Sequence, residues 1–311
     1  KKKNCVGTMA LTSAMSTFTR RIPRRSFALA ASDNVSSLGA DDVAIKMTAS
    51  PVTVNGTMSG AGVVTSVGSS VKNFSVDDVV FSQAPLGEFR EVVKVSSKKL
   101  VKVSPGVPSE YASIIDAPCT AEHLLKDVKA GESIVQSGAD SLVGQSVIQL
   151  AQARGITTIN IVSSVADDDE MIALCSNIGG DVVCPSTYAV SHRFKDLVSD
   201  LPKPVLAIHS ETLQDPKLTE KKLREVVETA SEDDLLKLKV ASVMSRLASK
   251  SVSSTTPVPI EQQTVDSVCE AFKAQQLHLW VEKYPTEDLD FVSEKVKEVA
   301  PGFRAPILSF N

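Results

Sequence analysis

The sequence predicts an α/β protein whose centre is a doubly wound parallel sheet, and residues 132–163 carry that prediction. Ile134 and Val135 lie in a short apolar run, which is typical of a buried parallel strand. A turn of small residues follows at 137–141, and apolar side chains then recur at helical spacing until a glycine stops the helix. The apolar run 156–162 predicts a second strand. A strand, a glycine-bearing turn, a helix and a strand in this order indicate a Rossmann-type fold.

The turn before this helix has the layout that binds a dinucleotide pyrophosphate, because backbone N–H groups and the positive helix end face the anion. The usual pattern requires a glycine two residues before Gly144, and Leu142 stands there instead. A side chain at this position occupies the space through which the phosphates approach the backbone. We therefore interpret the turn as a vestige and expect no bound cofactor. Its candidate contact residues are Gly138, Ala139, Ser141, Leu142, Val143, Gly144 and Ser163.

Several stretches of the chain resemble a single family. The run VQSGADSLVGQSVIQLAQARGITTINIV at 135–162 is similar to the nucleotide-binding core of mitochondrial trans-2-enoyl-thioester reductases, within the medium-chain dehydrogenase/reductase superfamily. Residues 60–81, 86–104, 117–125 and 268–310 resemble further motifs of that family. The resemblance covers most of residues 41–311.

The resemblance implies two lobes after a basic arm at 1–32. One is a Rossmann-type, nucleotide-binding-like lobe at 121–265. The other is a discontinuous GroES-like lobe, a partly open β-barrel, at 33–120 and 266–311, and the short strands predicted between 60 and 104 fit it. Further predicted elements are strands at 41–48, 181–183, 204–209, 235–243, 277–281 and 307–310, and helices at 107–125 and 217–230.

Residues 1–32 carry seven basic residues and no acidic one. Their Arg, Ser and Thr content is typical of a mitochondrial targeting segment, so we predict a protein of the mitochondrial matrix. Two alternatives stay open: a plain basic tail, or a retained arm that contacts RNA or an acidic protein. The remaining residues carry a net charge of −11, which disfavours nucleic-acid binding over the body of the protein.

The cysteine pattern and the hydropathy of the chain exclude other classes. The five cysteines form no C-x-x-C pair and no histidine lies at ligand spacing, so we expect no metal site. No apolar run approaches the length that spans a membrane.

The resemblance also implies a proton donor that this chain lacks. In the family, the strand matching 41–48 leads into a loop whose tyrosine is credited with donating the proton while NADPH delivers hydride. Here residues 49–56 lead almost directly into Gly60. A proton donor must lie within hydrogen-bond reach of the reacting atom, so we assign no catalytic residue. The chain's three tyrosines lie elsewhere in the sequence, at Tyr111, Tyr188 and Tyr284.

Two histidines are candidates by position alone. His123 falls in the stretch that resembles the family's N-P-x-T-A-Y motif, and we interpret it as a helix-surface residue. His209 ends the fourth predicted strand of the Rossmann-type lobe. We interpret His209 as structural, because the sequence indicates no partner for it.

Other positions that the resemblance implies for the cofactor have changed as well. Residues 163–165 replace an Arg-rich turn that pairs with the 2′-phosphate of NADPH, and the acidic run 167–170 follows. The glycines after the fourth and fifth strands are replaced by residues 209–212 and 243–246. The Ser/Thr-rich stretch 249–259 replaces a segment that builds the family's dimer, so a conventional homodimer is not expected.

These observations favour a degenerate enoyl-thioester reductase that serves as a structural, protein-interaction subunit of a mitochondrial assembly. We expect this assembly to be a mitochondrial ribosome, an assembly intermediate of that ribosome, or a respiratory complex. One alternative is an active NADPH-dependent trans-2-enoyl-CoA reductase, with NADPH as its cofactor if the site survives. A second alternative is a module that binds an acyl chain or an acyl carrier.

Overall fold

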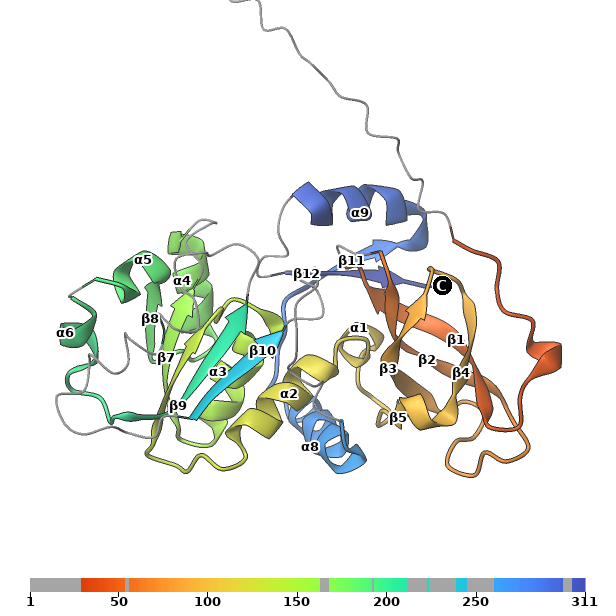
Figure 1. Cartoon of the computed structure of the whole chain (residues 1–311), viewed down its shortest axis with the longest axis horizontal. Helices are drawn as coiled ribbons and strands as arrows, with labels where there is room; N and C mark the ends of the chain where they lie inside the picture. The colour runs from red at the N-terminus through yellow and green to blue at the C-terminus, as the bar shows by residue number, and fades with distance from the viewer. Residues whose placement is uncertain are drawn as a thin grey trace, which may run out of the picture.

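The computed structural model describes residues 29–53, 56–162, 168–191, 193–211, 223, 239–244, 260–298 and 304–310. These residues form two lobes, each built on its own sheet, with helices α1, α2 and α8 between them (Figure 1). The three intervening helices are Ser109–Ala112, Asp116–Leu125 and Gln262–Lys273. The helical crossing predicted at 107–125 is therefore confirmed as two consecutive helices.

The Rossmann-type lobe contains a five-stranded sheet in the order β10-β9-β6-β7-β8, and every pairing in it is parallel. The predicted apolar runs become its strands, which confirms the α/β assignment. Their bounds are Ser133–Ser137 (β6), Thr157–Val162 (β7), Val182–Pro185 (β8), Pro204–Glu211 (β9) and Lys239–Met244 (β10).

Helices cover both faces of this parallel sheet, as a doubly wound fold requires. On one face, α3 (Leu142–Ala153) and α4 (Asp168–Asn177) pack through Ile148 and Met171 against Val162 of β7. On the opposite face, α5 (Ser186–Ala189) and α6 (Phe194–Val198) pack against the other side of the strands. The chain runs from β6 to β7 in one direction, whereas β9 lies on the other side of β6. The topological switch point therefore falls between β6 and β9.

The second lobe contains a seven-stranded sheet in the order β11-β12-β1-β2-β3-β5, with β4 paired to β1. β1 pairs antiparallel with β2, and with β4 and β12 at different points along its length. This branching agrees with the partly open barrel predicted for the lobe. The strands are Asp42–Pro51 (β1), Met58–Val67 (β2), Val79–Gly87 (β3), Val92–Ser96 (β4), Leu100–Lys102 (β5), Val281–Pro285 (β11) and Ala305–Ser309 (β12).

The end of the chain returns to this second lobe, so the lobe is discontinuous in sequence (Figure 1). β12 pairs with β1, and the register joins Ala49 to Ser309. The helix α9 (Leu289–Glu298) covers this part of the sheet through Leu289, Val292 and Val296. None of the described helices is long and apolar enough to cross a membrane.

Two glutamines on α3 hold the segment that leads back to the second lobe. Gln149 accepts a hydrogen bond from the His278 N–H through Oε1 (2.7 Å) and donates one to the His278 carbonyl through Nε2 (3.1 Å). One turn earlier, Gln145 Oε1 accepts a hydrogen bond from the Trp280 N–H (3.3 Å). The Rossmann-type helix and the returning segment are therefore joined by side-chain hydrogen bonds to the backbone.

The prediction of a strand at 277–281 is wrong. Residues 277–280 are not part of a strand, and β11 begins only at Val281. The glutamine side chains of α3 satisfy the backbone that a neighbouring strand would have paired. Trp280 is partly buried and packs against the α3–α4 face of the Rossmann-type lobe, which agrees with its interpretation as a core residue.

Other predictions lie wholly or largely outside the described residues. Only Leu223 of the predicted helix 217–230 is described, where it is helical and buried. The Ser/Thr-rich stretch 249–259 and most of the basic arm are not described. The division of the chain into residues 33–120, 121–265 and 266–311 stays a prediction.

We expect Gln149→Ala to lower the free energy of unfolding by about 2 kcal/mol, because it removes the hydrogen bonds that hold both backbone groups of His278. Urea denaturation followed by circular dichroism measures this loss. Gln152→Ala is the matched control, since Gln152 is an exposed residue of the same helix. Equal unfolding midpoints for the two variants would contradict the assigned role of Gln149.

Candidate functional site

The turn between β6 and α3 keeps a tightly determined backbone. Gly138 has φ +65°, a left-handed conformation that glycine adopts without steric cost. Ser141 caps α3: its Oγ accepts a hydrogen bond from the Gly144 N–H (3.1 Å), and its N–H donates to the Gly138 carbonyl (3.0 Å). The sequence folds here into the strand–turn–helix that the small residues predicted.

Gly144 is required for the helix to approach the turn. A Cβ atom at this position would lie 2.5 Å from the Gly138 carbonyl oxygen and 2.6 Å from Cα of Ala139. Both neighbours are backbone atoms, which cannot move aside as a flexible side chain can. The first turn of α3 therefore lies directly against residues 138–139 because this position has no side chain.

The first N–H groups of α3 point toward the end of the helix where an anion would bind. Ser141 caps Gly144, so Leu142 and Val143 have no acceptor within the helix for their N–H groups. The Leu142 side chain is half-buried and packs against the central core between the lobes, whereas Val143 is 8% exposed. The helix end is thus favourable for an anion, but it carries a leucine where an approaching phosphate needs open backbone.

An acidic residue lies next to the cap. Asp140 immediately precedes Ser141 and is only 9% exposed. Burial raises the pKa of the Cys175 thiol on α4, and the nearby Asp140 carboxylate raises it further. An acidic side chain therefore occupies the position that precedes the helix cap. The sequence contained this signal, but we did not interpret Asp140 as part of the site.

Ser137 and His209 lie side by side at the topological switch point between β6 and β9. The two residues are register partners at the carboxyl ends of these strands. The Ser137 hydroxyl and Nδ1 of His209 are 2.8 Å apart, and the residues are 3% and 5% exposed. Ligands of open α/β sheets bind beyond the strand ends at a switch point, and here a buried polar pair lies at that position.

The buried position agrees with the interpretation of His209 as structural, but Ser137 is a partner that the sequence did not indicate. The sequence alone could not reveal the pair, because Ser137 and His209 lie 72 positions apart and meet only through the pairing of β6 with β9. The other candidate, His123, is exposed on α2, which agrees with its interpretation as a helix-surface residue.

Two hydrogen bonds join the described residues on either side of positions 54–55 in the connection between β1 and β2. The Gly56 N–H donates to the Thr53 carbonyl (3.0 Å), and the Thr53 hydroxyl donates to the Thr57 carbonyl (3.4 Å). Val52 is fully buried and Gly56 has φ +65°. Residues 52–57 contain no tyrosine and no other ionisable side chain.

The three tyrosines take part in packing and polar contacts elsewhere. Tyr111 on α1 stacks on Phe272 at 5.0 Å between ring centroids, and its hydroxyl is 3.3 Å from Nδ1 of His278. Tyr284 on β11 accepts a hydrogen bond from Lys295 (2.7 Å). Tyr188 packs against the face of the sheet that α5 and α6 cover. No catalytic role is assigned to them.

The cysteines of the described region do not offer a reactive thiol. Cys119, Cys175, Cys184 and Cys269 are all buried. Burial raises the pKa of the Cys119 thiol far above its ordinary value and that of Cys184 to about 12. A thiolate is the nucleophilic form, so these side chains behave as apolar core groups. Across the described residues, no three His, Cys, Asp or Glu side chains come together as metal ligands would.

Comparison with known proteins finds similar reductases, although no family model matches the chain. The mitochondrial enoyl-[acyl-carrier-protein] reductase of Dictyostelium discoideum is 38% identical over 159 residues, covering 49% of this chain and 45% of that protein. The namesake from Arabidopsis thaliana is 37% identical over 164 residues, covering 51% and 44%. The chain is a relative of the mitochondrial enoyl-thioester reductases. It spans about half the length of the curated relatives it matches.

Solved structures show the same fold over almost the whole chain. A mutant enoyl thioester reductase from Candida tropicalis gives a TM-score of 0.66 at 14% identity, over 91% of this chain and 94% of that chain. The complex of Etr1p with NADP and crotonyl-CoA gives 0.64 at 13% identity, over 89% and 93%. The quinone oxidoreductase of Escherichia coli in complex with NADPH gives 0.63 at 15% identity, over 89% and 94%. The described lobes therefore have the medium-chain dehydrogenase/reductase architecture.

The residues at the turn fit the dinucleotide of such reductases poorly. The Gly138 turn, the Ser141 cap and the close approach of Gly144 keep the shape of a phosphate-binding turn. Leu142 stands where the resemblance implies a glycine, and the buried Asp140 lies next to the helix cap. Ser163, the remaining predicted contact, lies outside the described residues, whereas three of the four residues of the acidic run 167–170 form the start of α4. No step of a reaction is therefore derived through the cofactor.

We expect Gly144→Ala to lower the free energy of unfolding by about 3 kcal/mol, because its Cβ would overlap the backbone of residues 138–139. Alanine normally stabilises a helix relative to glycine, so the steric clash reverses the usual sign. Thermal unfolding compared with Gly106→Ala measures the effect. Gly106 has φ +93° in open space, and its replacement costs only the backbone strain of about 1 kcal/mol. A stabilised Gly144→Ala protein would contradict the tight contact.

Proposed function

We propose that this chain keeps the architecture of the mitochondrial enoyl-thioester reductases without their hydride-transfer chemistry. It acts instead as a protein-interaction subunit of a larger assembly in the mitochondrial matrix. A mitochondrial ribosome, its assembly intermediate and a respiratory complex are the assemblies that fit such a subunit. The proposal follows from where the chain differs from the reductases that it resembles, because function depends on the site and not on the fold.

The β1–β2 turn is the observation that carries this proposal. General acid catalysis needs a proton donor within hydrogen-bond reach of the reacting atom. The turn that takes the place of the family's tyrosine-bearing loop is closed by its own hydrogen bonds and has no ionisable side chain. The chain lacks this donor in a part of the fold that is otherwise well formed, with both flanking strands paired.

Two features of the Rossmann-type lobe support the proposal independently. The buried Ser137–His209 pair lies at the strand ends where the family has glycines beside the cofactor. Leu142 and Asp140 lie at the turn where a pyrophosphate would bind. The changes fall on the groups that would contact cofactor and substrate, whereas the apolar positions that build the sheets remain buried.

A second candidate is an active NADPH-dependent enoyl-thioester reductase, and the shape of the β6–α3 turn favours it. Gly138, Ser141 and Gly144 keep the backbone conformation of a phosphate-binding turn. Related structures in complex with NADPH, or with NADP and crotonyl-CoA, have the same fold. A proton donor from solvent or from another segment is then required. Binding of an acyl chain or an acyl carrier in the former cleft stays a further prediction.

The primary proposal predicts no turnover of crotonyl-CoA by the purified chain with NADPH, measured as the loss of NADPH absorbance. It also predicts no NADPH binding at millimolar concentration by calorimetry. Leu142→Gly restores the family's glycine, so we expect it to gain NADPH affinity without gaining turnover, since the donor is still missing. Leu142→Ala is the matched control, because it retains a side chain at the helix start.

Turnover by the unmodified chain would overturn the primary proposal and establish the second candidate. NADPH binding without turnover would agree with the proposed loss of hydride transfer. It would also show that the chain still binds a dinucleotide. Failure of Leu142→Gly to differ from Leu142→Ala would show that Leu142 is not what opposes the cofactor.

A subunit role predicts that the protein migrates with a large complex when gently lysed mitochondria are separated by size. We expect the tagged chain in fractions far above its own mass, together with a constant set of proteins. Ribonuclease treatment separates an RNA-dependent association through the basic arm from a purely protein one. Recovery only as a monomer, or as a conventional homodimer, would contradict the subunit role.

A further inference from the structure

An aromatic side chain is exposed on the outer face of α9. Leu289, Val292 and Val296 are buried in the core of the second lobe, as the inward positions of an amphipathic helix are. Phe291 lies between them in sequence and is 61% exposed, more than any other large apolar side chain of the described residues. Figure 1 shows α9 along one side of the second lobe, on the side away from α8. The helix therefore presents a phenylalanine to solvent.

A second aromatic ring lies beside Phe291. The ring of Tyr284 on β11 is half-buried, and its centroid is 6.5 Å from that of Phe291. Nζ of Lys295 lies 5.4 Å from the Tyr284 centroid and donates to the Tyr284 hydroxyl (2.7 Å) and to Glu282 (3.1 Å). These contacts hold the Tyr284 ring in place. A single exposed apolar residue needs no explanation, but two adjoining rings form a patch whose geometry is set before a partner binds.

Acidic side chains flank the two rings. Residues 285–294 contain four acidic residues and no basic one. They are Asp288, which is half-buried, and Glu287, Asp290 and Glu294, which are exposed. Glu294 is three residues after Phe291, a spacing that puts both side chains on the same side of a helix. We define the α9 surface as Tyr284, Glu287, Asp288, Asp290, Phe291 and Glu294.

The α9 surface matches the chemistry of an arginine side chain. A guanidinium group is planar, so it stacks on an exposed aromatic ring, and its fork of N–H groups pairs with a carboxylate. A lysine ammonium would pair with the carboxylates but has no flat face to lay on the ring. The phosphates of RNA would be repelled by the acidic residues. Charge and shape together therefore favour a basic protein segment that carries arginine.

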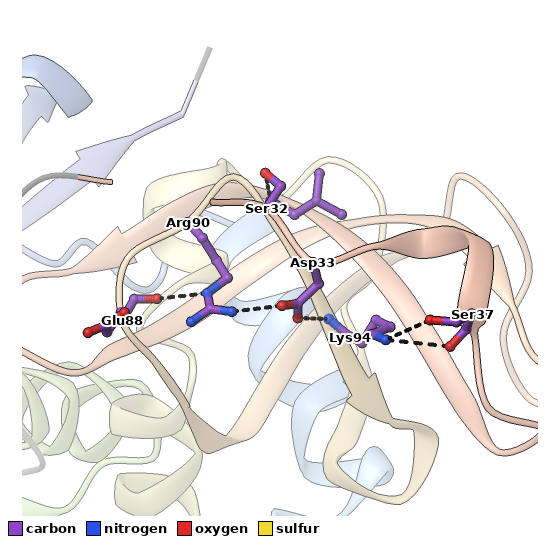
Figure 2. Close-up of polar contacts among 7 residues, drawn as sticks. Ser32, Asp33, Ser37, Glu88, Arg90 and Lys94 are labelled. Atoms are coloured by element: carbon purple, nitrogen blue, oxygen red, sulfur yellow. Dashed lines mark hydrogen bonds and ion pairs between the residues drawn. The ribbon is translucent and has the colours of Figure 1, made fainter. Parts of the chain in front are cut away.

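The β4 edge of the same lobe is covered by the chain itself. β4 pairs with β1 on one side, and residues 30–37 lie along its other side. The Asp33 N–H donates to the Val92 carbonyl (3.0 Å). The Asp33 carboxylate accepts a hydrogen bond from the Lys94 N–H (2.8 Å) and pairs with Arg90 (2.7 Å) (Figure 2). A partner that added a strand to β4 would first have to displace this segment, so a helix face is the more accessible place for docking.

We propose that the α9 surface docks an arginine-bearing basic segment of a neighbouring protein in the assembly. An arginine of that segment stacks on Phe291 and pairs with the carboxylates around it. Aromatic anchors of this kind carry a large share of the binding energy of protein interfaces. The inference rests on the subunit role given in the proposed function and deepens it, because it names the surface and the chemistry of the partner.

The first test is binding of a fluorescent oligo-arginine peptide to the full chain, measured by anisotropy at physiological ionic strength. We expect Phe291→Ala to weaken binding about tenfold, because it removes the ring on which the guanidinium stacks. Val76→Ala is the matched control and should leave binding unchanged, since Val76 is 53% exposed and precedes two acidic residues of the same lobe. An oligo-lysine peptide of the same length should bind more weakly and should not distinguish the two variants.

Four outcomes of these measurements would overturn the proposal. Equal affinities of the two variants for oligo-arginine would show that Phe291 is not part of the contact. Equal affinities of the unmodified chain for oligo-arginine and oligo-lysine would show that charge alone binds the peptide. Binding of single-stranded RNA that Phe291→Ala weakens would make a nucleic acid the occupant. A homodimer on gel filtration that Phe291→Ala dissociates would make a second copy of this chain the occupant.

The second test separates this proposal from the subunit role itself. Tagged Phe291→Ala and Val76→Ala chains are expressed in cells, and gently lysed mitochondria are separated by size. We expect Phe291→Ala to be lost from the large fractions and Val76→Ala to stay in them with the unmodified chain. If both variants stay, the subunit role stands and the α9 surface is not its contact. If the unmodified chain is itself absent from the large fractions, the subunit role fails, and this proposal fails with it.

Discussion

The contact between α3 and the β6 turn is the constraint on which the rest of the structure depends. Because Gly144 has no side chain, the helix starts directly against the backbone of residues 138–139. This contact fixes the axis of α3 over the parallel sheet. It thereby places Gln145 and Gln149 opposite the segment 278–280, where they hold the backbone that returns to the other lobe. One close approach at the start of the helix therefore determines how its far side joins the two lobes.

The same contact explains why the turn keeps the shape of a cofactor site while its chemistry has changed. Glycine is needed at position 144 for packing, whether or not a ligand binds. No such close contact accounts for the leucine at position 142, where the resemblance implies a glycine. The glycine at position 144 is therefore explained by packing, because any side chain there would overlap neighbouring backbone atoms. Its presence does not by itself indicate a bound ligand.

Local patterns predicted the architecture well, because strand and helix periodicity are properties of neighbouring residues. The β6–α3–β7 unit, the parallel sheet and the discontinuous lobe follow from such patterns and from the family resemblance. The contacts of the candidate site were harder to predict, because they join residues that are far apart in sequence. The Ser137–His209 pair depends on the register of β6 with β9, and the failed strand at 277–281 depends on glutamines of α3. Neither has a signature within a short stretch of sequence.

A buried row of polar side chains crosses the Rossmann-type sheet and has a consequence for how its strands align. Gln136 on β6 donates to the Gly144 carbonyl and to Asn160 on β7, and Asn160 in turn donates to Thr158 and to the Val182 carbonyl of β8. Sliding an apolar strand by two residues keeps the same faces buried and costs little by itself. Such a slip would separate these amides from their partners inside a dry core, where an unmade hydrogen bond is expensive. The row therefore selects one alignment of β6, β7 and β8 among several that hydrophobic burial alone would accept.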